Sequence, residues 1–192
     1  MLRIPRIIMI FVLLMPLPPT AVSAEDFDPA VAIGEMAARS AAISNIQTIG
    51  RICESMTFWQ SVALLGTARR WTFVYSLGGN DRAPWTLRLS NFLGESENEV
   101  IQAKRALSRT GAFDETQASA LDGLLAKERE LRDLSGEVHR LLMQDRVEEA
   151  ASLYRDMTIP LNRDIGVAVY SITNALNSSI SDTALKARVA LK

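Results

Sequence analysis

Turn-forming residues are few in this 192-residue chain, and they fall at widely spaced points. One group is the run GGND at 78–81, followed by Pro84, and another is the Thr-Gly pair at 110–111. Glycine, proline and asparagine are the strongest local signals for turns. The stretches between these groups repeat apolar residues every three or four positions, as amphipathic helices do. The spacing therefore predicts a small number of long helices.

Two of these helices are expected in the first half of the chain. The first runs from Pro29 to Tyr75 or Leu77, and the second from Pro84, a residue favoured in a helical first turn, to Ser108. The stripe predicted for the first helix consists of Met36, Ser40, Ile43, Gln47, Ile49, Cys53, Met56, Val62, Leu65 and Ala68. The stripe of the second consists of Trp85, Leu89, Phe92, Ser96, Val100, Ala103 and Leu107.

The second half predicts two more helices. Asp114 and Gln117 have the spacing of a capping box, so the third helix should begin there and reach Gln144. Its stripe includes Leu124, Leu131, Leu134, Val138 and Leu141, with the long stem of Lys127 at the intervening seam position. A break around residues 145–146 then starts a fourth helix, whose seam is Ala150, Tyr154, Met157, Leu161, Ile165, Ala168, Ile172 and Ala175.

Pro160 falls inside the fourth pattern and should bend that helix without ending it, because the apolar stripe continues past the proline. Four helices with short connections predict an all-α fold, an antiparallel four-helix bundle in which the first and fourth helices are the long ones.

Residues 1–24 have the layout of a secretory signal peptide: two arginines, a short apolar run, prolines, and the small residues Val22-Ser23-Ala24 before the expected cut. The predicted domain is then 25–192, in the periplasm or secreted, with no membrane span after processing. Cleavage removes two basic residues and no acidic one, so the mature chain is slightly acidic. Such a charge balance argues against nucleic acid as a partner.

The residues give little support for catalysis, a metal or a cofactor. Cys53 is the one cysteine, among apolar neighbours, and reads as a buried side chain. His139 is the one histidine, and no serine lies in a nucleophile elbow. The acid pairs at 128 and 130 and at 148–149 are expected on solvated faces. We therefore predict a protein that is not an enzyme; the alternative is a haem- or metal-carrying bundle that uses His139.

Arginines and aromatic residues gather around the 78–81 turn, and they form the candidate ligand site. Arg69 and Arg70 come near the end of the first helix, and Trp85 and Arg88 begin the second. Guanidinium groups beside aromatic rings suit a carboxylate or another small anion. The competing interpretation is an aromatic plug at the end of the bundle, with the arginines paired to Asp81 and other acids.

From about residue 27 to 185 the chain resembles the extracytoplasmic sensor domain of methyl-accepting chemotaxis receptors. The likeness rests on Arg140-Leu141-Leu142, on the segment EEAASLY at 148–154, and on Pro160-Leu161. The resemblance implies a four-helix bundle with long outer helices and a small ligand held near Arg69 and Arg70. Because no apolar run of spanning length follows Ile180, it implies a sensor-like bundle detached from a membrane span and signalling region.

These observations predict an exported, sensor-like bundle that binds a small solute or a helical protein partner, with a link to chemosensory signalling. A purely structural envelope protein is a further alternative, and its association would use an exposed stripe containing Val167 and Val169. The resemblance and the length of the first helix also predict a homodimer.

Overall fold

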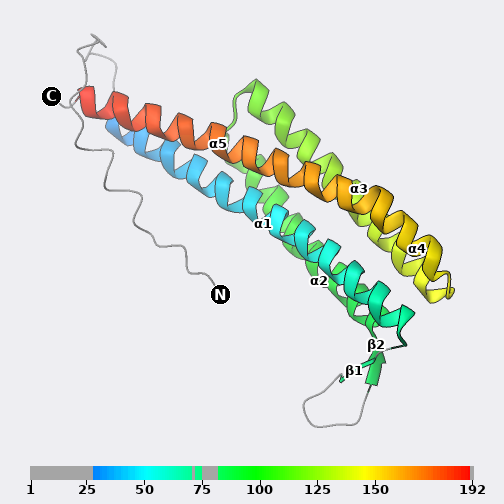
Figure 1. Ribbon diagram of the computed structural model, residues 1–192. Coiled ribbons are helices and arrows are strands. Elements are labelled where there is room, and N and C mark those ends of the chain that lie inside the picture. Colours follow the sequence, from blue (N-terminus) through cyan, green and yellow to red (C-terminus); the bar gives the residue numbers. More distant parts are fainter. Residues whose placement is uncertain (1–27, 71, 75–81, 191–192) are drawn as a thin grey trace.

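The computed structural model describes residues 28–70, 72–74 and 82–190, and these fold as an antiparallel four-helix bundle. Its helices are α1 (Pro29–Ala68), α2 (Trp85–Arg109), α3 (Glu115–Met143) and a fourth that combines α4 (Val147–Leu153) with α5 (Ile159–Ala190). Figure 1 shows the start of α1 and the end of α5 together at one end, opposite the small β hairpin. The predicted fold class, with its long first and fourth helices, is confirmed. No helix among the described residues is long and apolar enough to cross a membrane.

The predicted helix boundaries hold at most ends. Pro84 is the N-cap of α2, and the Asp114–Gln117 capping box opens α3, with the Asp114 carboxylate accepting from the Gln117 N–H at 2.8 Å. Asp145 adopts a left-handed φ of 58° in the break before α4. The predicted signal peptide, 1–24, lies outside the described residues.

The end of the first helix was predicted wrongly. α1 stops at Ala68, and β1 (Thr72–Val74) pairs antiparallel with β2 (Arg82–Pro84), so Phe73 is opposite Ala83. Arg70 has a φ of 53°, which ends the right-handed helix. The β-branched residues and the aromatic residue of 72–74 favour an extended backbone over a continued helix. Tyr75 and Leu77, the predicted ends, lie outside the described residues.

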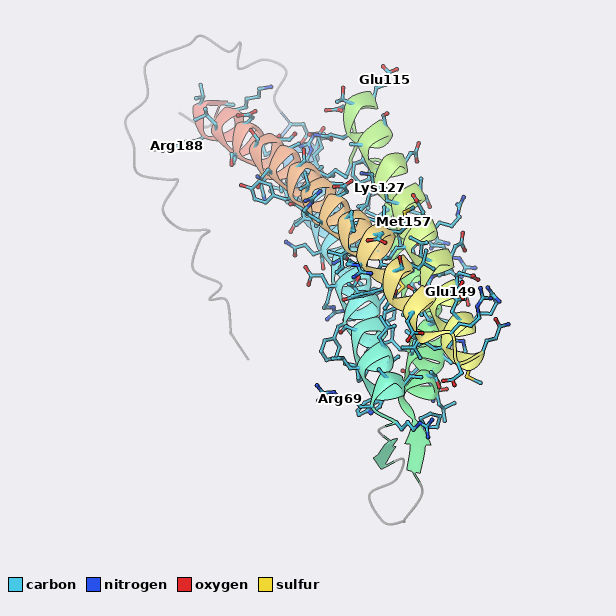
Figure 2. All side chains as sticks on the ribbon, turned by 45° about the vertical axis from the view of Figure 1, so that its right-hand side comes forward. Arg69, Glu115, Lys127, Glu149, Met157 and Arg188 are labelled. Carbon is cyan, nitrogen blue, oxygen red and sulfur yellow. The ribbon has the colours of Figure 1, made fainter. Side chains whose placement is uncertain are left out.

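A five-residue π turn, Tyr154–Thr158, joins α4 to α5. The N–H of Ile159 bonds to the carbonyl of Tyr154, five residues back, just before Pro160, which has no N–H to donate. The wider turn shifts the following residues, so Thr158 is fully buried and Met157 is 48 % exposed on the outer side of the fourth helix (Figure 2). The predicted seam position of Met157 is therefore wrong by one residue, while Ile165 and Ile172 are buried as expected.

The core consists of two apolar clusters along the bundle axis. The larger includes Ile46, Met56, Leu124 and Ile165, and the smaller, nearer the hairpin, includes Leu64, Leu89 and Val138. α1 and α5 approach closely at Gly50, as shown by the distance of 3.1 Å that a Cβ added there would have to Cγ2 of Val169. Val169 therefore faces α1, which corrects its predicted place on an exposed stripe.

Candidate functional site

The four predicted ligand-site residues lie at the hairpin end of the bundle, where α1 ends and α2 begins. Arg69 is the C-cap of α1 and is exposed, beside the strands in Figure 2, and Arg70 follows it, also exposed. Trp85 is the first residue of α2 and contacts α1 at Gly66, where an added Cβ would overlap Cδ1 of the indole. Because Gly66 has no side chain, the indole of Trp85 reaches the α1 backbone. This contact ties the end of α1 to the start of α2.

Trp85 and Arg88 belong to an aromatic cluster that also includes Trp59 and Phe92. The rings of Trp59 and Trp85 stack with centroids 6.3 Å apart and an interplanar angle of 25°. Phe92 lies at 6.5 Å from the same Trp59 ring. Arg88 covers Trp59 with its Cζ 5.0 Å from the ring centroid, a cation–π contact. The structure therefore joins Trp85 and Arg88 through Trp59, a residue that the sequence reasoning missed.

The cation–π contact with Trp59 involves only one face of the Arg88 guanidinium. Its Nη1 lies 3.7 Å from Oε2 of Glu95, which is an ion pair but longer than a hydrogen bond. The Arg88 side chain is 37 % exposed, and within the described parts of the chain it makes no hydrogen bond. One face of the guanidinium is thus covered by an indole, and among the described residues its N–H groups face only the Glu95 carboxylate, beyond hydrogen-bond distance. Asp81, the predicted pairing acid, lies outside the described residues.

A cluster of charged side chains lies inside the bundle, although the sequence predicted Glu128 on a solvated face. Glu128, predicted on a solvated face, is 1 % exposed; its Oε2 accepts from Lys104 Nζ at 2.7 Å and its Oε1 from Arg132 Nε at 3.1 Å. Arg132 also donates through Nη1 to the carbonyl of Leu93 at 3.0 Å. The spacing of Leu124, Glu128 and Leu131 is the signal that would have placed Glu128 in the seam.

Gln60, Ser135 and Thr158 form a buried layer next to this ion cluster. Gln60 donates through Nε2 to Oγ of Ser135 at 2.6 Å, and Thr158 donates through Oγ1 to Oε1 of Gln60 at 3.2 Å. Ser135 in turn donates to the carbonyl of Leu131 at 2.7 Å. Each of these side chains is hydrogen-bonded to another member of the layer or to the backbone, so the layer ties three helices together.

The other predicted side chains take structural places. Cys53 is fully buried, as expected, and burial raises the pKa of its thiol from 9.0 to about 12. Lys127 pairs at 3.9 Å with Asp164 on the edge of the seam, and Glu149 is exposed and pairs with Arg146.

His139 is half-buried on α3, and burial lowers its pKa. Within the described ranges no three His, Cys, Asp or Glu side chains gather as metal ligands. The haem alternative stays a prediction.

Comparison of the chain with protein-family models, with curated proteins and with solved structures finds no match in any of the three.

Proposed function

We propose that this protein is an exported, sensor-like bundle that binds a small anionic solute, without catalysis, at the Arg88–Trp59–Trp85 cluster beside Arg69 and Arg70. The observation that supports the proposal is the Arg88 guanidinium, held 5.0 Å above Trp59 and making no hydrogen bond with the described residues. A guanidinium supported in this way is pre-oriented, so less conformational freedom is lost when it binds a carboxylate.

The neighbouring rings define the kind of solute. Trp59, Trp85 and Phe92 offer half-buried aromatic surface next to the charged group. A planar carboxylate can place its two oxygens on the N–H groups of Arg88 and its apolar body against these rings. The exposed Arg69 and Arg70 add positive charge at the same end of the bundle and steer an anion towards it.

Benzoate is the probe that tests this proposal, with benzamide as its uncharged counterpart and inorganic phosphate as an anion without a ring. Titration followed by calorimetry and tryptophan fluorescence should give saturable binding of benzoate and little or none of benzamide. Arg88→Ala should weaken benzoate by on the order of tenfold or more, because a charge-assisted pair is lost.

The matched control is Arg51→Ala. Arg51 also lies on the α1–α2 side and pairs with a glutamate, Glu99 at 4.0 Å, but it is far more exposed than Arg88, and no aromatic ring of the described residues makes a cation–π contact with it. This control should keep the wild-type affinity. Benzoate affinity that is equal in Arg88→Ala and wild type would overturn the proposal, as would equal affinity for benzamide.

The contribution of the helix end is tested separately by the pair Arg69→Ala and Arg70→Ala. Both side chains are exposed, so the expected result is a several-fold weaker benzoate affinity that fades as salt concentration rises. No change in affinity would restrict the site to Arg88 and its rings and would contradict the role given to the two arginines.

A further inference from the structure

An exposed apolar patch on the outer side of α1 adjoins the Arg88–Trp59–Trp85 cluster. This α1 patch consists of Phe58, Val62 and Leu65, which follow one another at intervals of four and three residues and therefore lie on one face of the helix. Phe58 and Leu65 are 56 % and 55 % exposed, and Val62 between them is half-buried. The patch is therefore open surface and not part of the bundle core.

The α1 patch is continuous with the ring that supports Arg88. Phe58 meets Trp59 edge to face, with ring centroids 5.2 Å apart and an interplanar angle of 70°. Trp59 in turn lies under the Arg88 guanidinium, whose Cζ is 5.0 Å from the ring centroid. Apolar surface thus begins at a positive charge and extends away from it along α1.

Polar residues limit the α1 patch along the helix. Glu54 is exposed one turn before Phe58, and Arg69 is exposed one turn after Leu65. Beside the patch, the hydroxyl of Ser61 donates to the carbonyl of Phe58 at 2.7 Å. The helix rises by about 10 Å between Phe58 and Leu65. Contiguous apolar surface with a polar rim is typical of a binding site, whereas single exposed apolar residues are ordinary.

We propose that the solute bound at the cluster is an amphiphilic carboxylate, a medium-chain fatty acid, whose head lies on Arg88 and whose acyl chain lies along the α1 patch. This inference rests on the proposed function and names the class of solute. Because the charge lies at one edge of the patch, the surface is complementary to a molecule with an anionic head and an apolar tail. The length of the patch fits an acyl chain of about eight carbons.

Ligands that have only one of these two parts use only half of this surface. A small anion without a tail pairs with Arg88 and leaves the α1 patch in contact with water. An uncharged chain covers the patch but gains nothing from the guanidinium. The two parts together therefore distinguish a fatty acid from either fragment.

Chain length gives the first test. Burying a methylene group fully strengthens binding about fourfold, and a chain on an open surface is covered on one side only, so about twofold per methylene is expected. Calorimetry and tryptophan fluorescence with butanoate, hexanoate and octanoate, below the concentrations at which they form micelles, should show about a sixteenfold gain across the series. The gain should level off in longer acids, because the patch ends at Leu65. Octanol should bind far more weakly than octanoate.

Substitutions separate the tail from the head. Leu65→Ser should weaken octanoate several-fold and leave benzoate unchanged, because benzoate does not reach the far end of the α1 patch. Arg88→Ala should weaken both ligands. The matched control is Ile33→Ser, another exposed apolar residue of α1, 63 % exposed and about 38 Å along the helix from Phe58. This control should keep the wild-type affinity for octanoate.

The outcomes distinguish this inference from the proposed function on which it rests. If benzoate binds through Arg88 but affinity does not grow with chain length, or if Leu65→Ser leaves octanoate unchanged, the fatty-acid inference is overturned and the proposed function stands. Such a result would leave the α1 patch to a protein partner. Equal affinity for octanol and octanoate would also overturn the inference. If neither benzoate nor octanoate binds, both proposals fail. Circular dichroism of each variant shows whether the bundle remains folded.

Discussion

Gln60 donates through Nε2 to Oγ of Ser135 at 2.6 Å, and this bond joins α1 to α3 inside the bundle with both residues fully buried. Thr158 completes the layer from the π turn. On each of these three helices the polar residue stands between the residues of the larger and the smaller apolar cluster. A displacement of one helix along another would bury these groups without partners, so the layer selects the register of the bundle.

The first prediction concerns this layer. Gln60→Leu keeps most of the side-chain volume but leaves the hydroxyl of Thr158 without its acceptor and removes the donor to Ser135. We expect a loss of about 2 kcal/mol in the free energy of unfolding, measured by urea denaturation. Gln60→Leu combined with Thr158→Val should recover part of the loss, because both members of one pair become apolar. A single variant as stable as wild type would show that the layer contributes nothing.

The second prediction concerns the buried carboxylate. Glu128→Ala leaves Lys104 and Arg132 facing each other without the anion that both contact, and we expect a loss of about 3 kcal/mol. Glu130→Ala on the exposed face of the same helix should change stability by less than about 0.5 kcal/mol. Thermal unfolding of both variants distinguishes the cases, and equal melting temperatures would contradict the structural role of Glu128.

The main features of the fold follow from the sequence, because periodicity and caps are local signals. Asp114 and Gln117 act as predicted, and the break at Asp145 lies where the pattern weakens. The predicted end of α1 was wrong because helix propensity competes there with pairing to β2, a strand that comes later in the chain. The predicted seam position of Met157 was wrong because a π turn contains one residue more than the regular helical period assumes.

The candidate site was only half predictable. Trp85 and Arg88 could be placed near the turn from sequence distance alone. Trp59 could not, because its contact with them depends on how α1 and α2 rotate about their own axes. Glu128 and Gln60 were missed because a polar residue in an apolar stripe is buried only when a partner on another helix satisfies it, and no single helix shows that partner.

The third prediction uses the close contact between α1 and the start of α2. Gly66→Ala would place a Cβ against the indole of Trp85, and the rigid ring cannot yield without moving α2. We expect a loss of about 2 kcal/mol, as overpacking gives. Gly123→Ala is the matched control on α3, where a Cβ meets nothing within 4 Å, and it should stabilise by about 0.5 kcal/mol or more. Urea denaturation measures both, and effects of the same sign would contradict the packing at Gly66.

The fourth prediction concerns acid. Burial lowers the pKa of His139 below its ordinary 6.5, so the unfolded chain binds a proton more readily than the folded one. The stability that depends on neutral His139 is fully present above pH 6.5 and is lost as the pH falls through its folded pKa. His139→Gln should therefore lose less stability than wild type over this range. Urea denaturation at several pH values measures the difference, and parallel curves would contradict the effect.

The last prediction concerns alkali and Cys53, whose pKa is raised from 9.0 to about 12, mainly because burial disfavours the thiolate and secondarily because Glu128 lies near it. The folded state holds the proton in this window while the unfolded state releases it, so stability is full below pH 9.0 and falls as the pH rises towards 12. Cys53→Ala lacks the titrating group. The gap in the free energy of unfolding between wild type and Cys53→Ala should be constant at neutral pH and should shift against wild type above pH 9.0, towards a limit of about 4 kcal/mol.

The same burial predicts that iodoacetamide modifies Cys53 only as fast as the bundle opens, since the thiolate is the reactive form. A gap that stays constant into alkali, or a native thiol that reacts as fast as the unfolded one, would show that Cys53 is accessible to water.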